Sequence, residues 1–215
     1  LPFNFQLIQT TWNARKIAKL VTDYEAALPP GGWPNWVLGN HDQRRIATRV
    51  GAPQAGIAAM LLLTLRGTPT MYYGDEIGMA DADITPQDMR DPWEKNEPGL
   101  GLSRDPARTP MQWDASACAG FTTGTPWLPL AHDYRSDNVE ILRHDQASIL
   151  TLYQRLIGIR RRHSALAVGA FRLLGVEDDV LVYQREIPNE RIVVALNFGN
   201  SERPAPCDVD LTDAV

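Results

Sequence analysis

Apolar positions recur in two different patterns along this chain, and the change between them divides it into two parts. From residue 1 to about residue 163, short apolar stretches alternate with segments whose apolar positions return at helical spacing. That order is typical of a parallel sheet whose strands are connected by helices. Beyond residue 167, the stretches AFRLLGV, DVLVYQRE and RIVVALNF alternate at strand spacing, which predicts an antiparallel β module. We therefore expect one domain over 1–166 and a second, incomplete domain over 167–215.

Three strands and three helices are predicted within the first domain. From Ile17 to Leu28 the apolar side chains fall on one helical face, and the sequence PPGG that follows ends this helix. A second, mostly apolar helix runs from Pro53 to Gly67, because proline is tolerated at a first helical position and glycine terminates helices. The remaining predicted elements are strands at Pro2–Leu7, Trp36–Gly39 and Pro69–Tyr73 and a helix at Ile149–Arg162.

The segment 74–147 follows the third predicted strand and shows no convincing periodicity. It carries seven prolines. A connection of this size without secondary structure is uncommon in a compact domain unless it is functional. Because it leaves the carboxyl end of a parallel strand, where α/β folds place their sites, we interpret it as a functional loop.

The strand count indicates part of a larger sheet. Three strand–helix units do not close a (β/α)8 barrel, which takes about 250 residues, and an isolated parallel sheet would leave a long unpaired edge. The chain also starts at Leu1, without an initiator methionine or a signal-like apolar region. We therefore expect an α/β fold, the C-terminal part of a (β/α)8 TIM barrel followed by an antiparallel all-β domain, with about half of a barrel upstream.

Composition narrows the classes of partner. The 215 residues are 44% hydrophobic, which indicates a folded protein, and the net charge of −5 excludes a general attraction to nucleic acid. The basic run Arg160–Arg162 has a structural explanation, since it ends a predicted helix, where cations oppose the helix dipole. No apolar run approaches the roughly 20 residues that span a bilayer, so no membrane is expected. Cys118 and Cys207 lack the spacing of a zinc site or a disulfide framework, and we expect a reduced, cytoplasmic protein.

Three polar residues follow the second predicted strand directly, in the sequence WVLGNHDQ. An ionised Asp42 can accept hydrogen bonds from two vicinal hydroxyls, and His41 can donate to the same pair. Such contacts suit a sugar, and they strengthen if its ring flattens toward an oxocarbenium ion. The alternative is a loop carboxylate that caps a turn, and the position at a strand's carboxyl end raises the weight of the functional interpretation.

The third predicted strand ends in MYYGDEIGM, which offers a second pair of carboxylates. Asp75 and Glu76 would suit acid/base chemistry, but adjacent residues on a strand point to opposite faces, so at least one of them is expected to be structural. The same alternation favours a core position for at least one of Tyr72 and Tyr73, the other being available to stack on a sugar.

The long loop contains SRDPARTPMQWD, in which two arginines are four residues apart. Arg108 can bind substrate hydroxyls or pair with an active-site carboxylate, and the indole of Trp113 can cover the apolar face of a sugar. Alternatively, Arg104 and Arg108 only brace the loop by donating to its carbonyls. The acidic residues between 81 and 88 lack the glycine and terminal glutamate of a calcium loop, so we expect no metal and no cofactor.

The ordered stretches VLGNHDQ, LRGTPTMYYGDEIGM and RDPARTPMQWD resemble the α-amylase superfamily of glycoside hydrolases, in particular its α-glucosidase and oligo-1,6-glucosidase branch. The similarity extends from LPFNFQL to NFGNS and covers nearly the whole chain. It implies a (β/α)8 barrel followed by an antiparallel β domain, in which the three strands of the first domain are strands six, seven and eight.

The resemblance also implies site residues. Family members act by double displacement with retention, using a carboxylate nucleophile after strand four, an acid/base glutamate after strand five and a fixed aspartate after strand seven. Asp42 matches the third of these as the catalytic residue that stabilises the transition state, with His41 beside the bound glucosyl unit. Arg108 matches the arginine of the family's RDxxR loop, which helps to close the sugar pocket.

Two departures from the family pattern qualify the expected activity. The nucleophile and acid/base segments do not match any part of these 215 residues, and Arg44 stands where the family often has proline. We therefore interpret the chain as part of a retaining α-glucosidase that hydrolyses terminal α-linked glucose from oligosaccharides, inactive without the N-terminal half of the barrel. Two alternatives remain: a glucosyl-transferring or isomerising enzyme of the trehalose or isomaltulose synthase type, and a non-catalytic scaffold like the ectodomains of transporter heavy chains.

Overall fold

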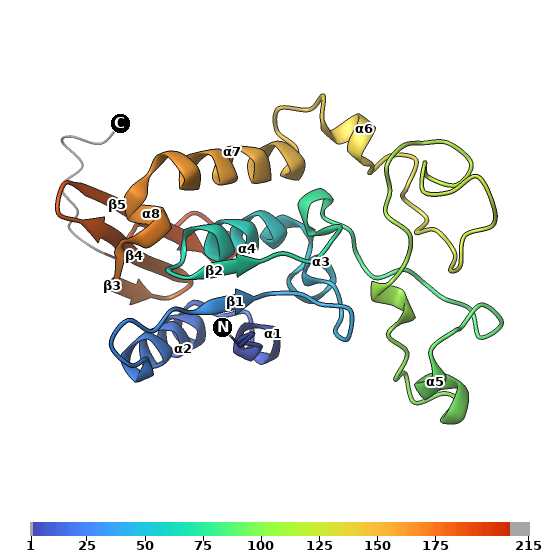
Figure 1. Cartoon of the computed structure of the whole chain (residues 1–215), viewed down its shortest axis with the longest axis horizontal. Coiled ribbons are helices and arrows are strands. Elements are labelled where there is room, and N and C mark those ends of the chain that lie inside the picture. The colour runs from blue at the N-terminus through green and yellow to red at the C-terminus, as the bar shows by residue number, and fades with distance from the viewer. Residues whose placement is uncertain (1, 207–215) are drawn as a thin grey trace. The chain divides into compact units, whose positions relative to one another are not determined.

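The computed structural model describes residues 2–206 (Figure 1). Short elements dominate its first three quarters, and a regular sheet follows. In chain order they are α1 (Gln6–Gln9), α2 (Ala14–Ala27), β1 (Asn35–Val37), α3 (Ile46–Val50), α4 (Ala52–Thr64), β2 (Thr68–Thr70), η1 (Asp75–Ile77), α5 (Pro92–Asn96), η2 (Asp105–Ala107), α6 (Val139–Leu142), α7 (Ile149–Arg162), α8 (Ser164–Val168), β3 (Ala170–Glu177), β4 (Val180–Ile187) and β5 (Glu190–Asn197).

The chain forms two compact units that are interleaved in sequence. The first combines 1–36, 60–69 and 158–215, and the second combines 37–59 and 70–157. Each unit is built from separate segments of the chain, whereas the predicted domains are continuous and meet near residue 166. The domains 1–166 and 167–215 stay a prediction.

The first unit contains the predicted antiparallel module. β3, β4 and β5 form one sheet in that order, and all pairs are antiparallel. A bulge lies between Leu173 and Gly175, and Asp178 turns the chain between β3 and β4 with a φ of 46°. Side chains on both faces of the central strand β4 are buried over its first six residues, which is why its sequence reads VLVYQR rather than as a strict alternation.

Arginine side chains satisfy the carbonyls at the end of α4. Arg160 donates to the carbonyls of Leu63 (2.8 Å), Leu65 (3.0 Å) and Gly67 (2.6 Å). The fully buried Arg185 of β4 donates to the carbonyl of Thr64 at 2.6 Å. The last carbonyls of a helix lack intrahelical donors, so these guanidinium groups replace water there. The first arginine of the basic run therefore stabilises the end of a different helix from its own.

The prediction of a strand over residues 2–7 is wrong, apart from one isolated bridge. Asn4 forms a single parallel bridge to Trp36, and α1 begins at Gln6. The Asn4 side chain accepts a hydrogen bond from the backbone N–H of Gln6 at 2.9 Å, a local contact that favours a helical turn over a ladder. The following helix, α2, agrees with its periodicity and begins at Ala14 because Asn13 caps it through the N–H of Lys16.

The other two of the three predicted parallel strands are present but short. β1 and β2 are hydrogen-bonded neighbours that run in the same direction (Figure 1), and each is regular for only three residues. Between them lie α4, close to its predicted range, and the short α3, which periodicity did not predict; α8 was also missed. The predicted helix Ile149–Arg162 agrees with α7.

The second unit includes the long segment after β2, which holds only single helical turns and irregular backbone. Ile77, Met79, Met111 and Leu150 form a buried apolar cluster under it. Asn138 is fully buried and caps α6 by accepting from the N–H of Ile141 at 3.0 Å. Buried side chains that accept hydrogen bonds from backbone N–H groups hold an irregular backbone in place, as the hydrogen bonds between strands do in a sheet.

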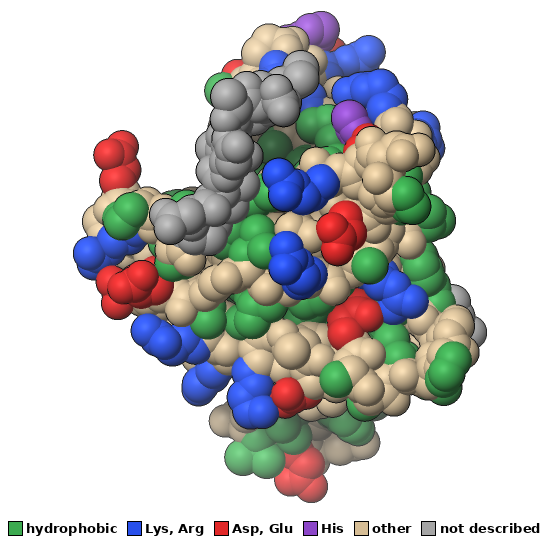
Figure 2. All heavy atoms as spheres, turned by 90° about the vertical axis from the view of Figure 1, so that its left-hand side faces the viewer, with side chains coloured by type: hydrophobic (Ala, Val, Ile, Leu, Met, Phe, Trp, Pro, Cys, Tyr) green, Lys and Arg blue, Asp and Glu red, His purple; other side chains and the backbone are tan. Residues whose placement is uncertain are grey.

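The surface carries both signs of charge. Figure 2 shows lysine and arginine side chains interspersed with aspartate and glutamate on the face that it presents. Within residues 2–206, no helix has the length and apolar character needed to cross a membrane.

Substituting Gly67 with alanine is expected to lower the free energy of unfolding by at least about 2 kcal/mol. Gly67 has a φ of 121°, and an added Cβ would lie 2.7 Å from the carbonyl oxygen of Pro34. Denaturant unfolding of the full chain measures this change.

Two other glycines separate the effect of backbone strain from that of the steric clash. Gly31 has a φ of 77° and open space where a Cβ would lie, so Gly31→Ala should lower the free energy of unfolding by only about 1 kcal/mol, from backbone strain. Gly124→Ala, exposed and without a strained φ, should change stability by less than about 0.5 kcal/mol. Equal losses in all three variants would contradict the steric account of Gly67.

Candidate functional site

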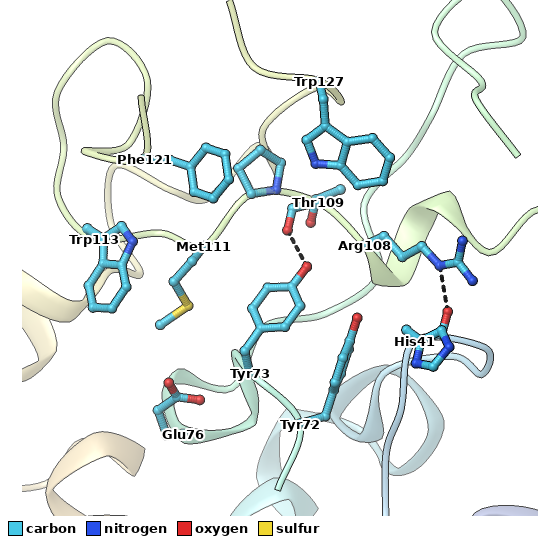
Figure 3. A pocket seen from close by; sticks show the side chains of 11 residues that line it. His41, Tyr72, Tyr73, Glu76, Arg108, Thr109, Met111, Trp113, Phe121 and Trp127 are labelled. Carbon is cyan, nitrogen blue, oxygen red and sulfur yellow. Dashed lines mark hydrogen bonds between the residues drawn. The ribbon is translucent and has the colours of Figure 1, made fainter. Parts of the chain in front are cut away.

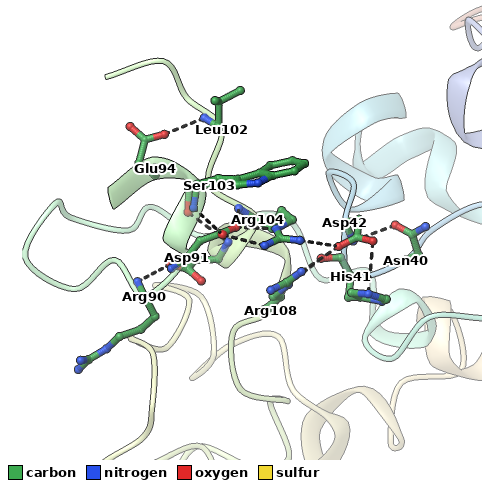
Figure 4. Close-up of polar contacts among 12 residues, drawn as sticks. Asn40, His41, Asp42, Arg90, Asp91, Glu94, Leu102, Ser103, Arg104 and Arg108 are labelled. Atoms are coloured by element: carbon green, nitrogen blue, oxygen red, sulfur yellow. Dashed lines mark hydrogen bonds and ion pairs between the residues drawn. The ribbon is translucent and has the colours of Figure 1, made fainter. Parts of the chain in front are cut away.

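Asp42 lies in the turn that follows β1, and its carboxylate is the centre of a cluster of cations (Figure 4). Oδ1 accepts from Arg108 Nη2 at 2.9 Å and from Arg104 Nη1 at 3.2 Å. Oδ2 lies 3.4 Å from Nε2 of His41. The Asn40 side chain accepts from the backbone N–H of Asp42 at 2.9 Å and so fixes the turn. One carboxylate oxygen is thus held by two guanidinium groups, while the other faces the imidazole.

Arg108 contacts both His41 and Asp42, the HD pair, in the turn after β1 that we call the HD turn. Its Nε donates to the carbonyl of His41 at 2.7 Å, and its Nη2 donates to the carboxylate of Asp42. It follows η2, where Asp105 and Pro106 form a tight turn that directs it toward these residues. The structure thus brings together the three residues that the sequence predicted as site residues, His41, Asp42 and Arg108.

Arg104 contacts the same carboxylate and a second, buried one. It donates to Asp91 through Nε at 2.7 Å and Nη2 at 2.8 Å, and only its Nη1 reaches Asp42. Arg104 therefore does more than brace the loop. Sequence reasoning missed Asp91, which lies 13 residues before Arg104 and shows no pattern that links the two.

A cavity of about 660 Å³ lies beside the HD turn, within the second unit (Figure 3). His41 and Arg108 line one side of it, the rings of Trp113 and Phe121 lie across from them, and the ring of Trp127 lies above Arg108 in Figure 3. These three rings are each more than two-fifths exposed. Aromatic faces next to hydrogen-bonding groups are the surfaces on which proteins bind sugars and other amphipathic ligands.

Tyr72 and Tyr73 form the floor of this cavity and are fixed by their hydroxyls. Tyr73 donates to the carbonyl of Thr109 at 2.7 Å, and Tyr72 donates to the carbonyl of Ala107 at 3.2 Å. Their rings pack edge to face at 4.7 Å. Neither is a fully buried core residue, so the expectation of a core position for at least one of them is wrong. The strand that would have alternated them ends at Thr70.

Asp75 and Glu76 do not alternate on a strand, because Gly74 turns the chain with a φ of 87° into η1. Asp75 is buried and accepts from the backbone N–H of Tyr72 at 3.1 Å, while its Oδ1 has no hydrogen-bond partner among the described atoms. Burial raises the pKa of Asp75 to about 7, and the hydrogen bond from Tyr72 opposes that shift. Glu76 accepts from the N–H of Gly74 at 2.7 Å and lines the cavity.

Two of the acidic residues between 81 and 88 accept hydrogen bonds from neighbouring groups. Asp81 accepts from Arg44 Nε at 2.9 Å and from the backbone N–H of Arg45 at 2.7 Å, and Asp88 accepts from the hydroxyl of Thr85 at 2.8 Å. Among residues 2–206, no three histidine, cysteine or acidic side chains come together in a way that would hold a metal ion. Cys118 is a free thiol, and Cys207 lies outside the described residues.

Comparison with known proteins identifies relatives that are much longer than this chain. A model of the α-amylase catalytic domain matches residues 2–169. The salivary alpha-glucosidase of Anopheles gambiae is 41% identical over 214 residues, which are 96% of this chain and 36% of that protein. The amino acid transporter heavy chain SLC3A1 of Rattus norvegicus is 38% identical over 204 residues, 93% of this chain and 29% of that one.

A solved structure shows the same fold. The crystal structure of the alpha-glucosyl transfer enzyme XgtA superposes with a TM-score of 0.84 and 33% identity, over 91% of this chain and 37% of that one. The chain therefore spans roughly a third of the length of each of these proteins.

Replacing Asp75 with asparagine is expected to stabilise the protein in a pH-dependent way. Because the folded pKa of about 7 lies above the ordinary value of 3.8, ionisation of Asp75 opposes folding, and wild-type stability falls as the pH rises from about 4 to about 7. Asparagine removes this loss, which is on the order of 4 kcal/mol at pH 8. Thermal unfolding of both proteins between pH 4 and pH 8 measures the difference.

The control is Asp23→Asn, which removes an exposed carboxylate from α2. Its stability difference from wild type should vary little over the same pH range, since exposed ion pairs contribute little. A difference between Asp75→Asn and wild type that stays constant from pH 4 to pH 8 would show that Asp75 does not ionise in this window.

Proposed function

This chain belongs to the α-amylase family of catalytic domains, and on that basis we propose that it is part of a retaining α-glucosidase, which hydrolyses terminal α-linked glucose from oligosaccharides. One observation carries the proposal: the carboxylate of Asp42 is held on one oxygen by Arg104 and Arg108 and lies beside His41, and two of these neighbours, His41 and Arg108, line the aromatic cavity. That is the arrangement expected of a carboxylate that binds two sugar hydroxyls and stabilises developing positive charge.

Asp42 acts in this proposal as the transition-state stabiliser. The two guanidinium groups occupy Oδ1, so Oδ2 is directed toward the side where His41 lies. Vicinal hydroxyls of a glucosyl unit donate to this carboxylate, and they become better donors as the ring gains oxocarbenium character. The interaction therefore strengthens along the reaction and lowers the barrier.

His41 and Arg108 bind the same glucosyl unit. The exposed imidazole of His41 offers a donor next to Asp42 Oδ2, and the bond from Arg108 to the His41 carbonyl keeps the HD turn and the long loop together. The aromatic rings across the cavity cover the apolar face of the sugar.

The proposed fold assigns the Asn4 bridge, β1 and β2 to strands six, seven and eight of a (β/α)8 barrel, with residues 167–215 belonging to an antiparallel C-terminal domain. The coverage of about a third of the relatives supports a match to part of a larger fold. The position of the cluster after β1 supports a barrel site, since barrel enzymes carry their sites at the carboxyl ends of the strands. From its cysteine usage we place the protein in the cytoplasm.

A retaining glucosidase also needs a nucleophile and an acid/base group about 5 to 5.5 Å apart. Asp42 is neither in this proposal. These 215 residues alone are therefore inactive, and they need the N-terminal half of the barrel, which supplies the two missing carboxyl groups.

Two other functions have support from particular relatives. XgtA is a glucosyl transfer enzyme, and transfer differs from hydrolysis only in whether a sugar or water accepts the glucosyl unit, which favours a transferring or isomerising enzyme as second candidate. The transporter heavy chain favours a scaffold. A scaffold has no need of the ordered carboxylate cluster around Asp42, and this argues against that role.

The first test is an α-glucosidase assay of the chain alone and together with the polypeptide that supplies the other carboxylates. We expect turnover of maltose only in the mixture, and Asp42→Asn should reduce it at least about 100-fold because the neutral amide does not stabilise positive charge. Asp23→Asn, which changes an exposed carboxylate of α2, is the matched control and should retain activity.

Each result discriminates between the candidates. Hydrolysis by the isolated chain would refute the need for the other half. Disaccharide products from maltose or sucrose, in place of free glucose, would favour the transferring enzyme, and an inactive mixture with normal sugar binding would favour the scaffold.

A further inference from the structure

Asp91 shares Arg104 with Asp42, and many hydrogen bonds fix its own position. No sequence pattern pointed to it. Its side chain is completely buried, and it caps α5 by accepting from the N–H of Trp93 at 3.2 Å. Its own backbone N–H donates at 2.9 Å to Asp105, another buried carboxylate. Asp91 is thus held on both its backbone and its side chain, and it cannot turn without breaking several hydrogen bonds.

Asp91 in turn orients Arg104. Its two carboxylate oxygens accept from Arg104 Nε (2.7 Å) and Nη2 (2.8 Å), and Oδ2 also accepts from the backbone N–H of Arg104 at 2.8 Å. This is a two-point, planar contact that fixes a guanidinium in direction as well as in place. These hydrogen bonds also hold the pKa of Asp91 well below its ordinary value, so Asp91 is ionised at neutral pH.

The rest of the loop packs around this pair. The guanidinium of Arg104 lies over the ring of Trp93, with its Cζ atom 4.7 Å from the ring centroid. The buried carboxylate of Glu94 accepts from the N–H groups of Gly99 and Leu102, each at 2.7 Å, and so closes the segment between α5 and Arg104. A segment without regular secondary structure is thereby given one conformation around Arg104.

Only one edge of the Arg104 guanidinium remains for other partners. Its Nη1 donates to Asp42 Oδ1 at 3.2 Å, the oxygen that also accepts from Arg108. Four side chains therefore form a chain of alternating charge, Asp91, Arg104, Asp42 and Arg108. The charges of these four side chains sum to zero. Asp91, at one end of the series, is buried and held by further hydrogen bonds.

We propose that Arg104 is a positioning residue, oriented by Asp91 so that it holds Asp42 Oδ1 and leaves Oδ2 for the sugar hydroxyls. This inference rests on the proposed function of Asp42. Arg108 alone does not supply the same constraint, because it is bound to the carbonyl of His41, in the same turn as Asp42, and can move with it. Arg104 connects the carboxylate of Asp42 to the buried carboxylate of Asp91, which lies in a different segment of the chain.

The choice of variant follows from charge. Removing Arg104 altogether would leave Asp91 as an unpaired buried charge, which often prevents folding. Asp91→Asn avoids this, since it removes the charge of Asp91 and leaves Arg104 at most a single contact, with the remaining amide oxygen. Arg104→Lys keeps the positive charge but cannot make the two-point contact. Arg90→Ala is the matched control, because its exposed side chain points away from Asp91 in Figure 4 and belongs to the same loop.

The first measurement is NMR of the full chain, which needs no activity. In wild type and Arg90→Ala, the Arg104 Nε–H should exchange slowly with solvent, and side-chain couplings of Asp42 should report one χ1 rotamer. In Asp91→Asn the exchange should become at least about 10-fold faster, and the couplings should show averaging over rotamers. Unchanged Asp42 couplings in Asp91→Asn would overturn the inference, since Arg108 would then suffice.

The second measurement is kinetic, on the mixture that hydrolyses maltose. Asp91→Asn and Arg104→Lys should each lower kcat about 10-fold while KM changes less than about 3-fold, because misplacement of Asp42 affects the transition state more than the bound sugar. Unchanged kcat in both variants would refute a positioning role. If the mixture has no activity but the NMR changes occur as expected, the proposed function fails while the orientation of Asp42 by Arg104 stands.

Discussion

The site depends on the orientation of one half-exposed carboxylate by charge-assisted hydrogen bonds. Asp42 follows a strand of three residues and has 46% of its side chain exposed, so neither packing nor a regular ladder fixes its direction. Two arginines from the long loop do so, and both use the same oxygen. Such bonds are shorter and stronger than neutral ones, and the planar guanidinium adds direction. They leave the other oxygen without a guanidinium partner, with Nε2 of His41 3.4 Å away.

The long segment between β2 and α7 can supply these arginines because its own backbone is satisfied from within. Buried carboxylates and amides, among them Asp91, Glu94, Asp105 and Asn138, accept hydrogen bonds from its N–H groups. Loops on rigid frames commonly carry function, but an unsupported loop of this size would hold its side chains in many positions. Here the polar interior of the segment replaces regular secondary structure as the source of rigidity.

Guanidinium groups serve the same purpose in both units. Arg160 and Arg185 bind carbonyls at the end of α4 in the first unit, and the buried Arg45 donates to the carbonyl of Tyr73 at 2.7 Å in the second. The carbonyls at the end of α4 lack intrahelical donors, and the carbonyl of Tyr73 lies in irregular backbone between β2 and η1. The difference at Asp42 is that the acceptor is a carboxylate, and that its neighbours His41 and Arg108 line a cavity.

The sequence by itself determined the elements whose signals are local. Periodicity located α2, α4, α7 and the antiparallel sheet, and the motifs around His41, Asp42 and Arg108 were sufficient to relate the chain to its family. It failed where a single contact overrides a pattern, as in the turn that Asn4 begins and the turn at Gly74 that moves Asp75 off a strand.

Only the tertiary structure decided what Arg104 does. Its partners lie 13 and 62 residues away, in segments without periodicity, so no spacing rule connects them. Hydrogen bonds between distant side chains depend on how the backbone brings them together, and that is a property of the folded chain rather than of any local run of residues.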